Sequence, residues 1–382
     1  MKDNTRLIHT KTKRGPVNTV NPPIERGSTV LLPTREILYG DGKVYGRMGL
    51  TVQRELEAAM CALENAKHTR LTANGLQACA LAMGAVVKAG DHVLIADCIY
   101  GPNRRFCTRR LKAMGVETTR FASTTGAEIA DLIQPNTKAI LLESPGSLTF
   151  EVMDIPAIAA AAKVRGVLTI FDNTWGAGVL HRPLDLGVDI SVQALTKYAV
   201  GHADAMGGAV MTNSKRLATQ IAACSEDWGI SIGPDDAYMA LRGLRTIHTR
   251  LKQHETSAYN VAEWLGTRPE VASLLHPGLE SHPGHALWKR DFGGANGLFG
   301  VILSKTSDAK LDAFLEALNL FAMGFSWGGY ESLLIPCDDQ LDRLPDDPIH
   351  DAAGPLLRLH IGLEDPGDLI ADLEQAFAVM AK

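Results

Sequence analysis

Four short apolar runs between residues 92 and 194 constrain the fold more than any other feature of the sequence. They are separated by stretches with helical spacing of apolar residues, among them Arg104–Met114 and Ile155–Val164. The runs are His92–Ala96, Lys138–Leu142, Val167–Phe171 and Ile190–Ala194. Continuous apolar strands that alternate with helices are typical of a parallel sheet buried on both faces. The pattern predicts an α/β large domain with a mainly parallel sheet flanked by helices.

The remaining segments predict two further parts of the chain. Residues 1–50 are rich in Pro, Gly, Thr and charge and lack periodicity, so we expect an extended N-terminal arm. Residues 51–243 would form the large domain, which begins with a helix at Thr51 and has another from Gly75 to about Val87. Residues 244–382 would form a smaller C-terminal α+β domain. Its expected elements are a helix over 244–265, strands over Leu298–Ser304 and Leu356–Gly362, and a helix over Asp368–Met380.

Composition excludes several classes of function. Lys and Arg number 38 against 43 Asp and Glu, a net charge of −5, which disfavours nucleic-acid binding. No apolar run approaches the roughly 18 residues that a membrane span needs, and the polar N-terminus lacks the apolar stretch of a signal peptide. The six cysteines contain no C-x-x-C pair. We therefore expect free thiols, a reducing compartment and a cytoplasmic location, without membrane or nucleic-acid partners.

The most informative pair of polar residues is Asp172 and Lys197. Asp172 follows the apolar run in TIFDNTW, and Lys197 follows the next run in SVQALTKYAVGHADAMGGA. Polar residues beyond the carboxyl ends of parallel strands face the ligand crevice. A lysine in this position can form an imine with an aldehyde, and a neighbouring carboxylate can pair with a protonated pyridine nitrogen. The pair predicts a site for pyridoxal 5'-phosphate (PLP).

Motifs along nearly the whole chain resemble the cysteine/methionine-metabolism family of PLP-dependent enzymes. They appear in the family's order: VYGRMGL, NGLQA, DHVLIADCIYGP, QPNTKAILLESPGS, FDNTWGAGVL, ALTKYAVGHADAMGG, LRGLRT, HALWKRDFGG, FSWGGYESLL and LLRLHIGLED. The resemblance implies fold type I, PLP as the cofactor and an amino-acid substrate. It also implies a homotetramer, a dimer of dimers in which neighbouring subunits share their active sites.

The resemblance assigns cofactor contacts to residues in these motifs. Lys197, Asp172 and Tyr100 are the implied catalytic residues, and the ring of Tyr100 would stack on the pyridine. Gly75 and Leu76 would bind the phosphate at a helix N-terminus, together with the hydroxyl of Thr196. The resemblance implies that Tyr45 and Arg47 reach the phosphate from a neighbouring subunit. The planar guanidinium group of Arg47 would fit the phosphate oxygens.

The resemblance also assigns the substrate contacts. Arg358 would bind the α-carboxylate, Ser326 and Trp327 would lie beside it, and Tyr45 would also contact the substrate. Trp327 marks the β-lyase branch, whose reaction on cystathionine gives homocysteine, pyruvate and ammonia. No metal site is implied.

Several positions depart from the family's pattern, so two reactions stay open. Val44, Met48 and Leu50 make the arm less polar than in the family, Phe325 replaces a tyrosine, and Ala194 and Leu195 replace small or hydroxylated residues. The alternative to β-elimination is elimination or replacement at Cγ of a homoserine-like substrate, such as canavanine, cystathionine or an O-acylhomoserine. A third hypothesis, a non-catalytic scaffold, is disfavoured because the cofactor residues are all present.

Three other features predict no site. His276, His282 and His285 lie in the loop HPGLESHPGH without further ligands at metal-site spacing, so we expect a polar surface loop. The segment Gly201–Gly208 lacks G-x-G-x-x-G, which disfavours a dinucleotide site. Cys98 has no histidine near it in sequence, so packing is expected.

Overall fold

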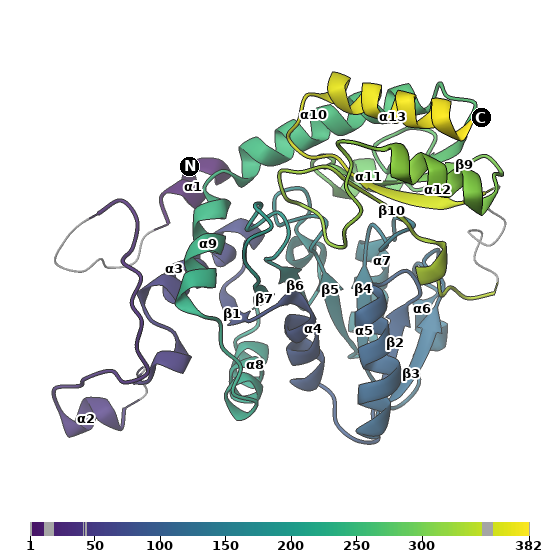
Figure 1. Ribbon diagram of the computed structural model, residues 1–382. Helices are drawn as coiled ribbons and strands as arrows, with labels where there is room; N and C mark the ends of the chain where they lie inside the picture. The colour runs from purple at the N-terminus through teal and green to yellow at the C-terminus, as the bar shows by residue number, and fades with distance from the viewer. Residues whose placement is uncertain (1, 11–18, 41, 43, 346–353, 382) are drawn as a thin grey trace.

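The chain forms a seven-stranded sheet and a separate four-stranded sheet, each with its own helices (Figure 1). This computed structural model describes residues 2–10, 19–40, 42, 44–345 and 354–381. The large sheet has the order β1-β7-β6-β5-β4-β2-β3. Its strands are β1 (His68–Thr72), β2 (His92–Ala96), β3 (Glu117–Phe121), β4 (Thr137–Glu143), β5 (Leu168–Asp172), β6 (Ile190–Ala194) and β7 (Gly208–Thr212).

The prediction of a mainly parallel sheet is confirmed. Strands β6, β5, β4, β2 and β3 pair in parallel, whereas β7 is antiparallel to both of its neighbours, β6 and β1. The parallel strands consist largely of buried apolar residues because helices cover the sheet. These helices and turns are α3 (Thr51–Glu64), α4 (Gly75–Gly84), α5 (Gly101–Arg105), a π-helical segment (Phe106–Leu111), α6 (Ile129–Leu132), α7 (Ile155–Val164), a 3-10 turn (Pro183–Leu186), α8 (Lys215–Asp227) and α9 (Pro234–Leu244).

Helices α3, α4 and α7 begin at the residues that the sequence indicates, whereas other helix bounds differ. In α3 the predicted apolar stripe of Val52, Leu56 and Met60 is buried. Helix α4 ends at Gly84 rather than near Val87, because the chain turns toward β2 through Lys88, whose N–H donates to Asp91 Oδ2 at 2.9 Å. The helical stretch predicted over 104–114 begins earlier, at Gly101, and includes the π-helical segment.

The smaller sheet lies above the carboxyl edge of the large one in Figure 1. It is antiparallel throughout, with the order β10-β11-β9-β8. Helices α10 and α13 lie on top of it, and Phe314 of α12 stacks on Phe377 of α13 with 4.8 Å between ring centroids. The elements are α10 (Ile247–Leu265), β8 (Val271–Leu275), α11 (His285–Asp291), β9 (Leu298–Leu303), α12 (Asp308–Ala317), β10 (Leu333–Pro336), a 3-10 turn (Asp338–Gln340), β11 (Leu356–His360) and α13 (Pro366–Met380). The domain boundaries at residues 50 and 243 stay a prediction.

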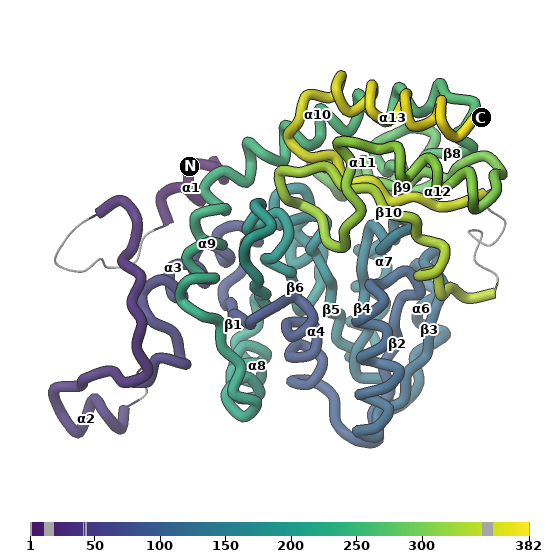
Figure 2. Tube along the Cα trace, viewed as in Figure 1, coloured from purple at the N-terminus to yellow at the C-terminus, as the bar shows by residue number. Residues whose placement is uncertain are grey.

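The N-terminal segment extends away from both sheets (Figure 2). Helix α1 (Asp3–Ile8), which precedes the projecting part of this segment, lies against the body, where Leu7 is buried near α3. Helix α2 (Arg35–Leu38) lies at the far end of the arm. Leu31 is 92% exposed and Tyr39 is 81% exposed. Large apolar side chains on a projecting segment suit a surface that another chain covers.

The prediction of a polar surface loop is wrong for His276 and His282. These side chains are only 1% and 5% exposed. In each ring Nδ1 accepts a hydrogen bond from a main-chain N–H two residues later, of Gly278 and Gly284 respectively. Nε2 of His276 is buried without a hydrogen-bond partner among the described residues. Among the described residues no cluster of His, Cys, Asp and Glu could hold a metal ion.

All six cysteines are free thiols, and Cys98 is fully buried. Within the described ranges, no helix has both the length and the apolar character that crossing a membrane requires.

Candidate active site

A cavity of about 870 Å³ lies at the carboxyl edge of the large sheet. It collects predicted site residues from both halves of the chain. Those that line it are Gly75, Leu76, Tyr100, Asp172, Thr196, Lys197, Ser326, Trp327 and Arg358. Side chains more than 250 residues apart in sequence therefore face one space.

Lys197 occupies the centre of this group of residues. It follows β6, and its main-chain N–H donates to Ala194 O at 3.2 Å. Nζ donates to Ser326 Oγ at 2.6 Å and lies 5.3 Å from the centroid of the Trp327 ring. Burial and the nearby positive charge of Arg358 lower the pKa of Lys197 to about 8, and the carboxylate of Asp172 acts in the opposite direction. The amine is therefore much closer to its neutral, nucleophilic form than an exposed lysine.

The backbone of the segment 325–328 packs closely against the backbone at Lys197. Ser326 has a φ of +86°, an unusual conformation for a residue with a side chain. Gly328 has a φ of +87°, and a Cβ there would lie 2.8 Å from the main-chain nitrogen of Tyr198. Strain of this kind persists where the surroundings fix it, often at functional sites. Phe325, in contrast, is 78% exposed at the rim of the cavity.

Arg358 lies on β11 of the smaller sheet and lines the cavity. The residue is 9% exposed, and Nη2 donates to Ser326 O at 3.3 Å. This is the only hydrogen bond that the structure gives this guanidinium group within the described residues, so further donors remain available to a carboxylate.

Asp172 ends β5 and is held by four donors. Oδ1 accepts from Thr174 N at 3.1 Å and Thr174 Oγ1 at 2.5 Å. Oδ2 accepts from Asn103 Nδ2 at 3.1 Å and from the Cys79 thiol at 3.6 Å. Burial raises the pKa of Asp172, and the hydrogen bonds from Thr174, Cys79 and Asn103 act against that rise. The carboxylate is fixed in orientation inside the protein.

Helix α4 points its N-terminus into the cavity. Asn74 caps the helix by accepting from Gln77 N at 2.9 Å. Gly75 is packed against β6 so closely that a Cβ would lie 2.3 Å from Ala194 Cβ. The free N–H groups of the first turn form an anion site. Thr196 also lines the cavity, and its Oγ1 accepts a hydrogen bond from Gly207 N at 3.3 Å.

Tyr100 stands at the start of α5 with 45% of its surface exposed, and its ring lines the cavity. Its main-chain N–H donates to Glu143 Oε2 at 2.7 Å.

Neither Glu143 nor Asn103 was among the residues predicted from sequence. Glu143 could have been found, because it ends β4 as Asp172 ends β5. Asn103 carries no such signal, because only the fold brings its helix to Asp172.

Tyr45 and Arg47 do not reach the cavity of their own chain. Both are exposed on the N-terminal arm, and the Arg47 guanidinium lies 5.9 Å from the centroid of the Tyr45 ring. Within one chain the structure separates them from the other predicted site residues.

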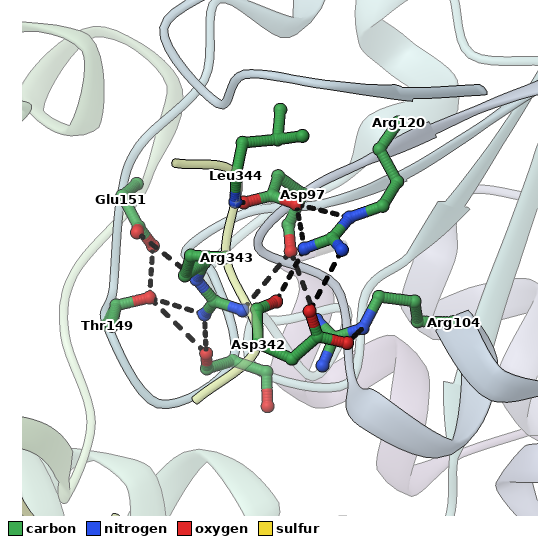
Figure 3. A network of polar contacts seen from close by, with 9 residues as sticks. Asp97, Arg104, Arg120, Thr149, Glu151, Asp342, Arg343 and Leu344 are labelled. Carbon is green, nitrogen blue, oxygen red and sulfur yellow. Dashed lines mark hydrogen bonds and ion pairs between the residues drawn. The ribbon is translucent and has the colours of Figure 1, made fainter. Parts of the chain in front are cut away.

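Figure 3 shows an ionic network whose residues Arg104, Arg120, Asp342 and Arg343 also line the cavity. Asp97 Oδ1 accepts from Arg120 Nε at 2.6 Å, and Oδ2 accepts from Leu344 N at 2.7 Å. Asp342 bonds to Arg120 and Arg104 at 2.9 and 3.2 Å. The network joins the segment after β10 to the carboxyl ends of β2 and β3.

The polar groups that line the cavity fit PLP. Helix α4 and Thr196 offer hydrogen-bond donors for a phosphate, the amine of Lys197 suits an aldehyde, and the carboxylate of Asp172 suits a protonated ring nitrogen. The unpaired guanidinium donors of Arg358 suit the carboxylate of an amino acid.

Comparisons with known proteins agree with this geometry. The family model for the Cys/Met metabolism PLP-dependent enzymes matches residues 4–378. A curated protein of Rhizobium johnstonii is 44% identical over 94% of this chain and 91% of its own length. Cystathionine beta-lyase MetC of Escherichia coli is 42% identical over 98% of both chains. The crystal structure of metB from Corynebacterium glutamicum superposes with a TM-score of 0.92 at 30% identity, covering 99% of this chain and 98% of that one. With the family model spanning almost the whole length, this chain belongs to the Cys/Met metabolism family of PLP-dependent enzymes.

Proposed function

We propose that this PLP-dependent enzyme is a carbon–sulfur β-lyase that converts cystathionine and water to homocysteine, pyruvate and ammonia. The observation that carries the proposal is the position of Trp327, whose ring centroid lies 5.3 Å from Lys197 Nζ. A tryptophan at this place marks the β-lyase branch in the family resemblance. Extensive similarity to the E. coli enzyme named cystathionine beta-lyase supports the same assignment.

Lys197 Nζ is the proposed base that removes the Cα proton of the substrate. A pKa lowered to about 8 leaves a useful fraction of the amine neutral near physiological pH. Ser326 Oγ, 2.6 Å away, accepts one hydrogen of the amine and so fixes its direction. Arg358 binds the substrate carboxylate and holds Cα against the amine, while Trp327 covers the same pocket.

Asp172 is the proposed partner of the ring nitrogen. When bound, PLP supplies an electron-withdrawing ring that stabilises the negative charge left on Cα. The protein's part is to hold one carboxylate in the correct orientation, which the hydrogen bonds from Thr174 and Asn103 provide. The N–H groups of Gly75 and Leu76 and the hydroxyl of Thr196 are the proposed phosphate contacts. Tyr100 is proposed to stack on the ring and exclude water.

We also propose a homotetramer of two close dimers in which Tyr45 and Arg47 complete the site of a neighbouring subunit. Support comes from the projecting arm, on which both residues are exposed and outside their own cavity. A cytoplasmic location is inferred from the six free thiols, which are typical of proteins from a reducing compartment.

One product analysis tests the reaction. The purified enzyme is incubated separately with cystathionine, cysteine and canavanine, and any keto acid is identified. Pyruvate from cystathionine is the expected result. Formation of 2-oxobutyrate or homoserine instead would place the reaction at Cγ, an outcome that the apolar arm residues Val44 and Met48 and the exposed Phe325 make worth testing.

A further inference from the structure

Two carboxyl groups end neighbouring strands at the floor of the cavity. Glu143 is the last residue of β4, Asp172 is the last residue of β5, and the two are paired residues in the parallel ladder. Neighbouring strands are about 4.8 Å apart, and paired residues project to the same face. Both side chains line the cavity. Two like charges this close inside a protein strongly oppose each other.

The surroundings of the two carboxyl groups are unequal. Asp172 accepts hydrogen bonds from four donors: Thr174 N, Thr174 Oγ1, Asn103 Nδ2 and Cys79 Sγ. Within the part of the chain that the structure describes, the carboxyl group of Glu143 accepts one, from Tyr100 N. Hydrogen bonds to an ionised carboxylate favour the charged form. The negative charge of the pair is therefore more stable on Asp172.

The charged groups around Glu143 lead to the same distribution. Burial raises the pKa of Glu143 well above its usual range, and the negative charges of Asp172 and Glu151 add to this rise. The Tyr100 N–H and the guanidinium group of Arg343 act in the opposite direction. The guanidinium group of Arg343 and the Tyr100 N–H do not offset burial and the two neighbouring negative charges.

We propose that Glu143 and Asp172 share one proton, which Glu143 holds, and that Glu143 is a positioning residue that fixes Tyr100 through its main-chain N–H. The inference deepens the proposed function, because it rests on Asp172 as the partner of the ring nitrogen. One negative charge at this edge of the sheet matches the one positive charge of the protonated ring. The neutral carboxyl group meanwhile anchors the residue proposed to stack on that ring.

Infrared spectra of the holoenzyme near neutral pH test where the proton lies. The carbonyl band of a protonated carboxyl group is expected in the wild type, and Glu143→Gln is expected to remove it. In Asp172→Asn the band remains but disappears at a lower pH, because the neighbouring negative charge is gone. Difference spectra cancel other buried carboxyl groups such as Glu64. A band that survives Glu143→Gln and is lost in Asp172→Asn would place the proton on Asp172 and overturn the proposal.

Cofactor binding tests the positioning role. Glu143→Gln keeps a neutral acceptor for Tyr100 N–H, so the apoenzyme should bind PLP within about twofold of the wild type. Glu143→Leu leaves that N–H without a partner and should weaken PLP binding about tenfold. Equal affinities in the two variants would refute the positioning role. These readouts do not depend on the product, so finding 2-oxobutyrate would refute β-elimination and leave the carboxyl pair intact.

Discussion

Lys197 Nζ donates a hydrogen bond to Ser326 Oγ at 2.6 Å across 129 residues of sequence. The acceptor has a φ of +86°, so its backbone is strained where its hydroxyl is used. Ser326→Gly should lower kcat/KM about tenfold, since the loss of a hydrogen bond to a charged group costs about 1.5 kcal/mol. The melting temperature of the Ser326→Gly variant should not fall, because glycine adopts this φ freely. Ser326→Ala is the matched control: it should lose the same activity but retain the strain. A fully active Ser326→Gly variant would contradict the prediction.

The stability of the apoenzyme should depend on pH through Lys197. Its pKa in the folded protein is lowered to about 8 from an ordinary value of 10.5, so the folded state disfavours the charged amine. Below about pH 8 both states are protonated, and the cost to folding is complete. As pH rises toward 10.5 the folded state releases its proton first, and the cost disappears. Lys197→Met should therefore stabilise the apoenzyme at about pH 7 but not at about pH 10.5, as measured by urea unfolding. A gain independent of pH would indicate better packing instead.

The network in Figure 3 should contribute measurably to stability. Asp97 is fully buried and joins Arg120 to the main-chain N–H of Leu344. Asp97→Asn removes the buried one of the two carboxylates that pair with Arg120, the other being Asp342, and the free energy of unfolding should fall by about 3 kcal/mol. Asp339→Asn is a suitable control, because Asp339 is exposed in the same segment, and a change within about 0.5 kcal/mol is expected. Equal effects of the two substitutions in denaturant titrations would refute this role of Asp97.

Sharing of active sites between subunits can be tested by complementation. Arg47→Ala and Lys197→Ala should each be nearly inactive, Arg47→Ala through weaker retention of PLP. In a mixed dimer, one site would combine an intact Lys197 with an intact Arg47 from the other subunit. Unfolding and refolding the two variants together should therefore restore activity to about half of the wild-type value per mixed dimer. No recovery, although mixed dimers form, would show that Arg47 acts in its own subunit or not at all.

The sequence predicts the parts of the fold that have a strong local pattern. The apolar runs at 92–96 and 190–194 are strands with the expected bounds, because a strand buried on both faces must be apolar throughout. Strand β1 (His68–Thr72) has no such pattern, because its first three residues are only partly buried. Strand β7 (Gly208–Thr212) begins at the end of the glycine-rich segment Gly201–Gly208, whose composition is typical of a loop. Both are fixed by pairing with each other, which local periodicity does not encode.

The residues of the candidate site also differ in how far the sequence alone predicts them. Lys197 and Asp172 follow strands, so their meeting at one edge of the sheet is predictable from order alone. Arg358 and Ser326 could be named only through the family resemblance, since no pattern places the smaller sheet above the larger one. The burial of His276 and His282 is not predictable from composition, because it accompanies a contact between Nδ1 of each ring and a main-chain N–H two residues later.

The location of Arg358 on β11, 161 residues after Lys197, has a consequence for biosynthesis. Chains emerge from the ribosome N-terminal end first, and domains fold as units. Lys197 and Asp172 are synthesised long before Arg358 and Ser326, so a nascent or prematurely terminated chain carries the cofactor residues without those proposed to select a substrate. Competence for the reaction is thus deferred until Ser326 and Arg358 have been synthesised.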